Sequence, residues 1–113
     1  MKYTFLETTN DKIPIKFGFG ALAKYSEQTN TTLADLDKLG NGMRLDQALL
    51  LIMCGIEDGF RAAKQDCNIT VSDLADMIDE DHDLIANAMN ILAEQMGGST
   101  KKKGKANKVK GKN

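Results

Sequence analysis

The side chains of this 113-residue chain that could carry out covalent chemistry are two cysteines and a single histidine. Cys54 lies within the longest apolar segment, Ala48 to Ile56, where burial disfavours the thiolate that a nucleophile requires. Activation of Cys54 by His82 is therefore not expected. The wide separation of these two residues and Cys67 also does not match the ligand spacing of a zinc site. We expect two free thiols in a reducing cytosol, and no enzymatic activity.

Closely spaced carboxylates offer a second kind of chemistry, the binding of a hard cation such as calcium. Asp79, Asp81 and Asp83 have the spacing that opens an EF-hand loop. The sixth loop position, which needs glycine for a sharp turn, is Leu84, and the twelfth, which needs a bidentate glutamate, is Asn90. We therefore expect no metal and no other cofactor. These carboxylates are instead expected to favour the positive N-terminal end of the helix that follows them.

The charge of the chain is divided between an acidic body and a basic C-terminal segment. Seven of the fifteen basic residues follow Thr100, which leaves eight against all sixteen acidic residues and a charge of about −8 on residues 1–100. Nucleic-acid binding by such a body is not expected, because it repels phosphates. The basic residues of the C-terminal segment are Lys101, Lys102, Lys103, Lys105, Lys108, Lys110 and Lys112.

Residues 97–113 show no apolar periodicity and are rich in glycine and lysine, which predicts a flexible, disordered tail. Two interpretations of its lysines stay open. As a polybasic arm, the tail would make weak, salt-dependent contacts with nucleic acid or with an acidic partner, which could be the body of the chain itself. Alternatively, the lysines are the trace of an adenine-rich message, because Lys101–Lys103 can be encoded by an uninterrupted run of adenines.

The elements that position these side chains are arranged around one predicted helix, Met43–Gln65, which contains the longest apolar segment. Its middle turns are apolar on nearly all sides, which is typical of a helix enclosed by other elements. Gly55 and Gly59 are expected to let another helix approach closely, and Asn68 is expected to end the helix in a left-handed conformation. The stripe expected to face the core comprises Leu45, Leu49, Ile52, Ile56, Phe60 and Ala63.

The apolar segment of this helix is too short to cross a membrane, because a span needs about 20 predominantly apolar residues. Charged residues flank it on both sides, with Asp46 before it and Glu57, Asp58 and Arg61 after it. Glu57 and Arg61, four residues apart, are expected to lie on a solvated edge of the helix.

The N-terminal residues have the period of two that is typical of half-buried strands, on either side of a polar connection at residues 7–12. This pattern predicts a β-hairpin whose aromatic face packs on the helices, with Pro14 on an edge strand or with its amide position facing outward. The alternating apolar residues are Tyr3, Phe5, Ile13, Ile15, Phe17 and Phe19.

Capping signals and apolar spacing predict four further helices. Thr32 with Asp35, and Thr70 with Asp73, have the spacing in which a threonine and an acidic side chain cap a helix start. The sequence therefore predicts a mainly α fold with a short N-terminal β-hairpin (α+β), as one domain over residues 1–96, followed by the basic tail at residues 97–113. The further helices are Phe19–Gln28, Leu33–Leu39, a segment from Val71 to the acidic cluster, and Leu84–Met96.

Two segments carry a resemblance to a known family. The first, IPIKFGFGALAKYSEQTNTTLADL at Ile13–Leu36, has a strand, a Phe-Gly step, an Ala-Leu helix and a threonine that caps a second helix. The second, ITVSDLADMIDED at Ile69–Asp81, is a threonine-capped helix that precedes the closing helix. In this order of elements, residues 1–96 resemble the tail assembly chaperones of long-tailed bacteriophages and prophages.

The resemblance implies a protein of the bacterial host cytoplasm that is absent from the mature virion. It would bind the tape measure protein, keep it soluble and assist tail tube assembly, with the tail tube protein as a further possible partner and self-association left open. Such chaperones are often made in two lengths by a −1 ribosomal frameshift, and this chain is then expected to be the shorter product, with slippage near Lys101–Lys103.

The client-binding surface is expected to include the end of the closing helix, through Met89, Leu92 and Met96, because this helix adjoins the flexible tail. Flexible methionines could adapt to a repetitive helical client, although methionine also serves as ordinary core filler. Two other classes of function remain as alternatives. One is a small nucleic-acid-binding or regulatory module that uses its lysine tail, and the other is a phage head–tail connector.

Overall fold

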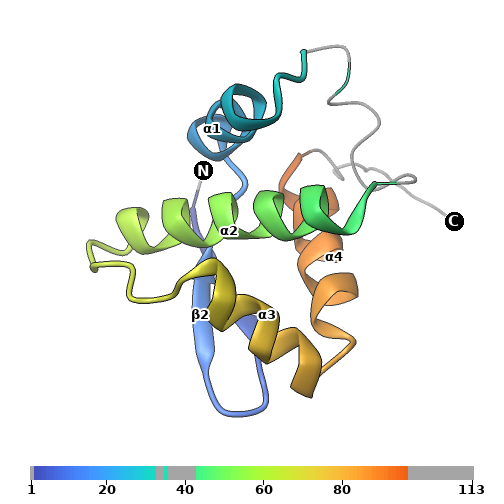
Figure 1. The fold of residues 1–113 in the computed structure, drawn as a ribbon. Coiled ribbons are helices and arrows are strands. Elements are labelled where there is room, and N and C mark those ends of the chain that lie inside the picture. Colours follow the sequence, from blue (N-terminus) through green and yellow to red (C-terminus); the bar gives the residue numbers. More distant parts are fainter. Residues whose placement is uncertain (1, 33–34, 36–42, 97–113) are drawn as a thin grey trace, which may run out of the picture.

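The computed structural model describes residues 2–32, 35 and 43–96. A two-stranded antiparallel hairpin is followed by helices in the described part of the chain, which confirms the predicted mainly helical α+β fold (Figure 1). Apart from Asp35, the predicted helix Leu33–Leu39 lies outside the described residues, as does the tail at residues 97–113. The elements are β1 (Thr4–Glu7), β2 (Lys12–Ile15), α1 (Phe19–Thr29), α2 (Leu45–Ala62), α3 (Val71–Glu80) and α4 (Leu84–Met96).

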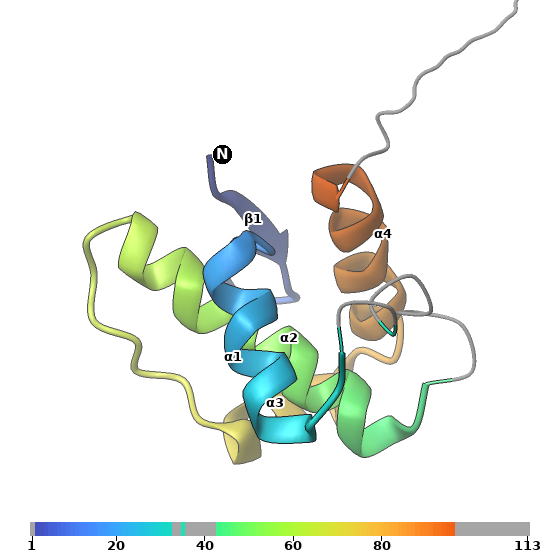
Figure 2. The same ribbon diagram turned by 90° about the horizontal axis from the view of Figure 1, so that it is seen from above.

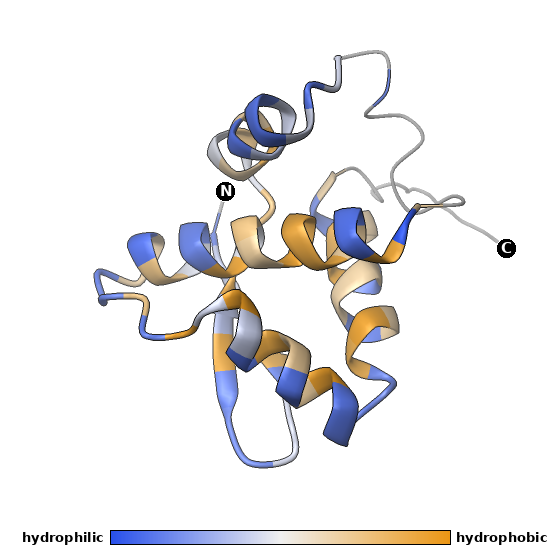
Figure 3. Cartoon of the chain, in the orientation of Figure 1, coloured by the Kyte–Doolittle hydropathy of each residue, from blue (hydrophilic) through white to orange (hydrophobic). Residues whose placement is uncertain are grey.

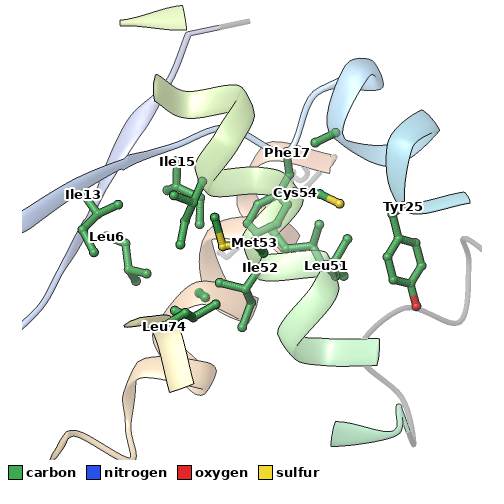
Figure 4. Packing of buried hydrophobic residues seen from close by; sticks show 14 of the residues in the cluster. Leu6, Ile13, Ile15, Phe17, Tyr25, Leu51, Ile52, Met53, Cys54 and Leu74 are labelled. Atoms are coloured by element: carbon green, nitrogen blue, oxygen red, sulfur yellow. The ribbon is translucent and has the colours of Figure 1, made fainter. Parts of the chain in front are cut away.

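Helix α2 crosses the middle of the molecule, and the other elements are placed around it (Figure 1). Every residue from Leu51 to Ile56 is buried, so the middle of the helix is enclosed, as its apolar sequence predicts. Figure 3 shows this middle part as hydrophobic and the two ends of the helix as more hydrophilic. In Figure 4, side chains from the hairpin, α1 and α3 surround α2, including Ile15, Tyr25 and Leu74.

The predicted core stripe of α2 holds in the middle of the helix and fails in its first turn. Ile52, Ile56 and Phe60 are buried, but Leu45 is 80% exposed. The neighbouring elements cover the middle of α2 and leave its beginning in solvent. Figure 2 shows α1 lying across α2, with α4 standing to one side.

The hairpin buries the opposite face of β1 from the one that its aromatic residues suggest. Phe5 lies opposite Pro14, and Leu6 lies opposite Ile13, so Leu6 and Ile13 share the core-facing side. The predicted aromatic face was therefore wrong for β1, where Phe5 is exposed. Tyr3, just before β1, and Phe19, at the start of α1, are exposed as well. The buried face consists of Leu6, Ile13 and Ile15, and continues with Phe17.

Strand β2 packs against α2 at very short range, and the two glycines of α2 make this possible. A Cβ atom on Gly59 would lie 2.4 Å from the backbone of Pro14 and Ile15, and one on Gly55 would lie 2.6 Å from the Phe17 ring. The Lys16 N–H also donates to the Gly55 carbonyl oxygen, at 2.9 Å. The prediction that another helix uses these glycines was wrong, because the hairpin and its exit occupy the position.

The position of Pro14 follows from the same packing. The Thr8 N–H donates to the Asp11 carbonyl oxygen near the hairpin tip, and hydrogen-bonded pairs alternate with non-bonded pairs along an antiparallel ladder. The pair Phe5–Pro14 is therefore non-bonded, and the backbone of Pro14 is directed toward α2. The nitrogen of Pro14 therefore faces away from β1, and the proline costs the ladder no hydrogen bond. This position agrees with the predicted outward-facing amide.

Helix α2 ends three residues earlier than predicted, at Ala62. Lys64 adopts the left-handed conformation (φ 61°), and the N–H of Lys64 donates to Arg61 while that of Gln65 donates to Phe60. This is a Schellman ending, in which two otherwise unpaired carbonyl groups are satisfied. The prediction that Asn68 is the left-handed stop was wrong. The two hydrogen bonds hold Lys64 in the left-handed conformation, which glycine and asparagine adopt more readily than lysine.

The start of α3 follows the sequence closely. The Thr70 side chain accepts a hydrogen bond from the Asp73 N–H at 3.1 Å, and the Asp73 carboxylate accepts one from the Thr70 N–H at 2.9 Å. These two bonds form the predicted capping box. Thr32 and Asp35 make related contacts, since the Asp35 carboxylate accepts from the N–H and hydroxyl of Thr32.

Helix α4 joins the core through one stripe and is fixed at its end by a side chain. Leu84, Ala88 and Leu92 are buried, as their spacing predicts. The Gln95 side-chain oxygen accepts a hydrogen bond from the Phe17 N–H at 2.6 Å, which ties the last turn of α4 to the hairpin exit. The C-terminal end of α4 therefore has a fixed place on the body.

Candidate functional site

Asp81 and Asp83, between α3 and α4, form part of a helix start, whereas the predicted place at this start was wrong for Asp79, which lies in the last turn of α3. The Asp81 carboxylate accepts a hydrogen bond from the Asp83 N–H at 3.1 Å, and the Asp81 carbonyl accepts one from the Leu84 N–H. These contacts place both carboxylates at the N-terminal end of α4, where the helix dipole favours negative charge. Among the residues that the structure describes, no group of three or more His, Cys, Asp and Glu side chains has a metal-binding arrangement.

The two cysteines are free thiols in different surroundings. Cys54 is buried in the middle of α2, whereas Cys67 is exposed in the loop before α3. Burial, and then the negative charge of Glu57, raise the pKa of the Cys54 thiol to about 11. Because the folded pKa exceeds that of the unfolded chain, the stabilising effect of this protonated thiol declines as the pH rises from about 9 towards 11.

We expect iodoacetamide at pH 8 to modify Cys67 and to leave Cys54 unmodified in the folded protein. A pKa raised by about two units lowers the thiolate fraction roughly 100-fold, and burial further limits access to Cys54. Peptide mapping by mass spectrometry measures the modification of each thiol. In denaturant both should react, and equal rates in the folded protein would contradict this assignment of Cys54.

A charged hollow of about 270 Å³ lies between α1 and α2. Lys24 of α1 pairs with Glu57 of α2, and Arg61 pairs with Asp58. The side chains of Glu57 and Arg61 are 39% and 67% exposed, which confirms the predicted solvated edge of α2, and each pairs with a different partner of opposite charge. Lys24 becomes harder to deprotonate through its bond with Glu57, which raises its pKa.

Asp58 is the one charged side chain that is buried among the described residues, at 7% exposed. Its Oδ1 accepts from Arg61, and Oδ2 has no hydrogen-bond partner in the described part of the chain. A Cβ on Gly20, in the first turn of α1, would lie 3.5 Å from Oδ1. The α1 start has no side-chain cap of its own, so the Asp58 charge stabilises its positive end. This role is structural.

An aromatic hollow of about 480 Å³ lies at the start of the chain and is lined by Lys2, Tyr3, Phe5 and Ala62. The rings of Tyr3 and Phe5 meet edge to face, with centroids 5.6 Å apart. Phe5 is 48% exposed, which is unusual for a phenylalanine that could have packed in the core. Sequence reasoning missed this surface because alternation alone does not reveal which face of a strand is buried.

A second groove, also of about 480 Å³, lies between the hairpin tip, the loop after α2 and the start of α3. Its apolar part is formed by Ile13, Pro14, Phe60, Ile69 and Met77. Carboxylates and amides surround this part, together with one ammonium group. These polar residues are Asp11, Lys12, Gln65, Asn68, Asp73 and Asp76.

The predicted client-binding residues on α4 differ in their surroundings. Leu92 is 4% exposed and belongs to the core, whereas Met96 is 42% exposed. Met89 is half-buried and packs against the core. Of these three side chains, Met96 offers the largest accessible surface to a partner. The seven tail lysines lie outside the described residues.

No helix in the part of the chain that the structure describes is long and apolar enough to cross a membrane. Comparisons with known proteins give no further assignment. The chain matches no protein-family model, no curated protein and no solved structure.

Proposed function

We propose that the chain is a tail assembly chaperone of a long-tailed bacteriophage or prophage. In this proposal it binds the tape measure protein in the host cytoplasm, keeps it soluble while the tail tube forms, and is left out of the virion. The observation that carries the proposal is the sequence resemblance of Ile13–Leu36 and Ile69–Asp81. The first segment contributes β2 and α1, and the second contributes the capped helix α3.

The surface of the domain supports the proposal on physical grounds. An excess of negative charge disperses copies of the chaperone and any client bound to it. Large apolar side chains are nevertheless exposed at several places, which gives a helical client apolar contacts. These side chains are Tyr3, Phe5, Phe19, Leu45, Val71 and Met96.

Met96→Ala is expected to weaken binding of the tape measure protein by a factor of about 5–30, with little change in stability. The side chain is 42% exposed, so its removal takes away a contact surface of the order of 1–2 kcal/mol without leaving a cavity. Binding is measured by isothermal titration with a purified tape measure fragment, and stability by circular dichroism.

Leu92→Ala provides the matched comparison, one helical turn earlier on α4. Leu92 is a core residue, so its truncation should lower the free energy of unfolding by about 2–5 kcal/mol. If Met96→Ala lowers stability to the same extent and leaves affinity unchanged, the end of α4 is not part of the client-binding surface.

We also expect the intact gene to produce a second, longer protein in minor amount. The proposal makes this chain the shorter product, and Lys101–Lys103 can be encoded by a run of adenines on which a ribosome slips. Mass spectrometry of the proteins made from the intact gene would reveal a form with a different sequence after the slip. A single 113-residue product, from a message without a slippery run, would remove the frameshift and leave the basic-arm interpretation.

The alternative functions predict different partners. A nucleic-acid-binding module would retain nucleic acid through its tail with a steep dependence on salt, although the described domain is acidic. A head–tail connector would be found in purified virions, whereas the proposed chaperone would be absent from them. The identity of the neighbouring genes also separates these classes, because a very long helical reading frame directly downstream is expected only for the chaperone.

A further inference from the structure

The groove between the hairpin tip and α3 combines an apolar floor with an acidic rim. Ile69 and Met77 are half-buried in its floor, so both retain surface that a ligand can cover. The groove is lined by three carboxylates, Asp11, Asp73 and Asp76, and by one ammonium group, that of Lys12. The lining therefore carries a net charge of about −2. No ion pair within the described residues neutralises any of these three carboxylates.

This combination fits a lysine-rich peptide segment. A lysine side chain covers apolar surface with its long aliphatic stem and keeps its ammonium group at the edge, within reach of carboxylates. A purely acidic surface would attract any cation, whereas an apolar floor adds affinity only for a ligand that also has apolar surface. The groove therefore selects peptide lysines over simple cations.

We propose that the groove binds the lysine-rich C-terminal segment of the same chain, residues 101–113. The seven lysines are complementary in charge to the groove, and Val109, between Lys108 and Lys110, adds one apolar side chain for its floor. This inference does not depend on the proposed chaperone function.

The length of chain after α4 permits this contact within one molecule. Val109 follows Met96 by thirteen residues, which span at most roughly 45 Å when fully extended. The principal dimensions of the molecule are 43 × 33 × 28 Å, so the extended segment is about as long as the longest dimension of the body. Tethering also keeps the segment at an effective concentration of the order of millimolar, which favours a weak contact.

Occupation of the groove has a consequence for binding. Any basic segment of a partner protein that fits the same groove must displace the tethered lysines, so the tail acts as a built-in competitor. A form of the protein with a different C-terminal sequence would lack this competitor and present an open groove.

The test uses the full-length protein with a nitroxide spin label on Cys67, which is exposed and lies between the groove residues Gln65 and Asn68. In the 15N-labelled chain at low salt, the amide signals of residues 105–112 should be strongly broadened. They should recover at about 1 M salt, where the screening length is about 3 Å. Absence of broadening at low salt would overturn the proposal.

Two variants of α3 with the same change of charge make the test specific. Asp76→Lys changes the rim of the groove and should abolish the broadening, whereas Glu80→Lys, at the end of α3 and not part of the groove, should preserve it. Equal effects of the two variants would mean that the tail responds to overall charge alone and would refute the groove as its site.

A mixing experiment distinguishes contact within one chain from contact between two copies. Spin-labelled protein without 15N is mixed with 15N-labelled protein that carries a diamagnetic label on Cys67. No broadening of the tail signals is expected in this mixture. Broadening of the tail signals in this mixture would show that the groove holds the tail of a second copy, and would overturn the intramolecular proposal.

Discussion

Replacing Gly59 with alanine is expected to unfold the domain or to lower its free energy of unfolding by at least about 3 kcal/mol. The added Cβ would lie 2.4 Å from the backbone atoms of Pro14 and Ile15. Backbone of a paired strand cannot move aside alone, so β2 would have to separate from α2 and uncover Ile13 and Ile15. Against a total stability of roughly 5–15 kcal/mol, such a loss is large.

The control for this substitution is Gly20→Ala in the first turn of α1. A Cβ at Gly20 meets its nearest neighbour, the Asp58 carboxylate, at an ordinary distance of 3.5 Å. Alanine also loses less conformational entropy in a helix than glycine, so stability should be unchanged or higher by up to about 1 kcal/mol. Thermal denaturation followed by circular dichroism measures both variants. Similar melting temperatures would contradict the contact between β2 and α2.

Ile52→Asp should likewise leave the domain unfolded at room temperature. Ile52 of α2 is almost completely buried by the elements around this helix, and no described basic side chain belongs to this core. An unpaired carboxylate there costs several kcal/mol, in addition to the lost burial of the isoleucine. Far-ultraviolet circular dichroism and urea denaturation would show the loss of cooperative structure.

Leu45→Asp is the matched control, because it makes the same chemical change in the same helix. Leu45 is 80% exposed at the first position of α2, where the helix dipole favours a negative charge. Its effect should remain within about 0.5 kcal/mol. Equal destabilisation by the two variants would mean that the core side of α2 has been misassigned.

The order of the elements could be predicted from the sequence because each has a local signal. The apolar segment of α2 identifies a buried helix, and the pair Thr70–Asp73 identifies the start of α3 through contacts between neighbouring residues. Such signals depend on residues close together in the chain. These predictions hold in the folded protein because the interacting residues are neighbours in the sequence, and no distant segment has to supply a contact.

Apart from the end of α2, where Lys64 takes the left-handed position expected for Asn68, the errors concern features that depend on residues far apart in the sequence. Whether Tyr3 and Phe5 or Leu6 face the core depends on the register of β1 against β2 and on which side meets α2. The element that approaches Gly59 is likewise set by tertiary packing. Periodicity gives the two faces of a strand but not the identity of the buried one.

The candidate surfaces were less predictable than the fold. Nothing in the spacing of Asp11, Asp73 and Asp76 indicates that a hairpin tip and a helix start form one groove. On α4, the four-residue repeat grouped Leu92 with Met96, yet the structure buries the first and exposes the second. A helix stripe continues beyond the core when no other element covers its last turn.

The most direct test of the proposed function is the solubility of the tape measure protein when it is produced in bacteria with and without this chain. We predict that the tape measure protein is mainly insoluble alone, and that co-production with the wild-type chain brings most of it into the soluble fraction as a complex. Unfolded Ile52→Asp should have no such effect. An equally soluble tape measure protein in all three cases, or one that does not copurify with the wild-type chain, would contradict the proposal.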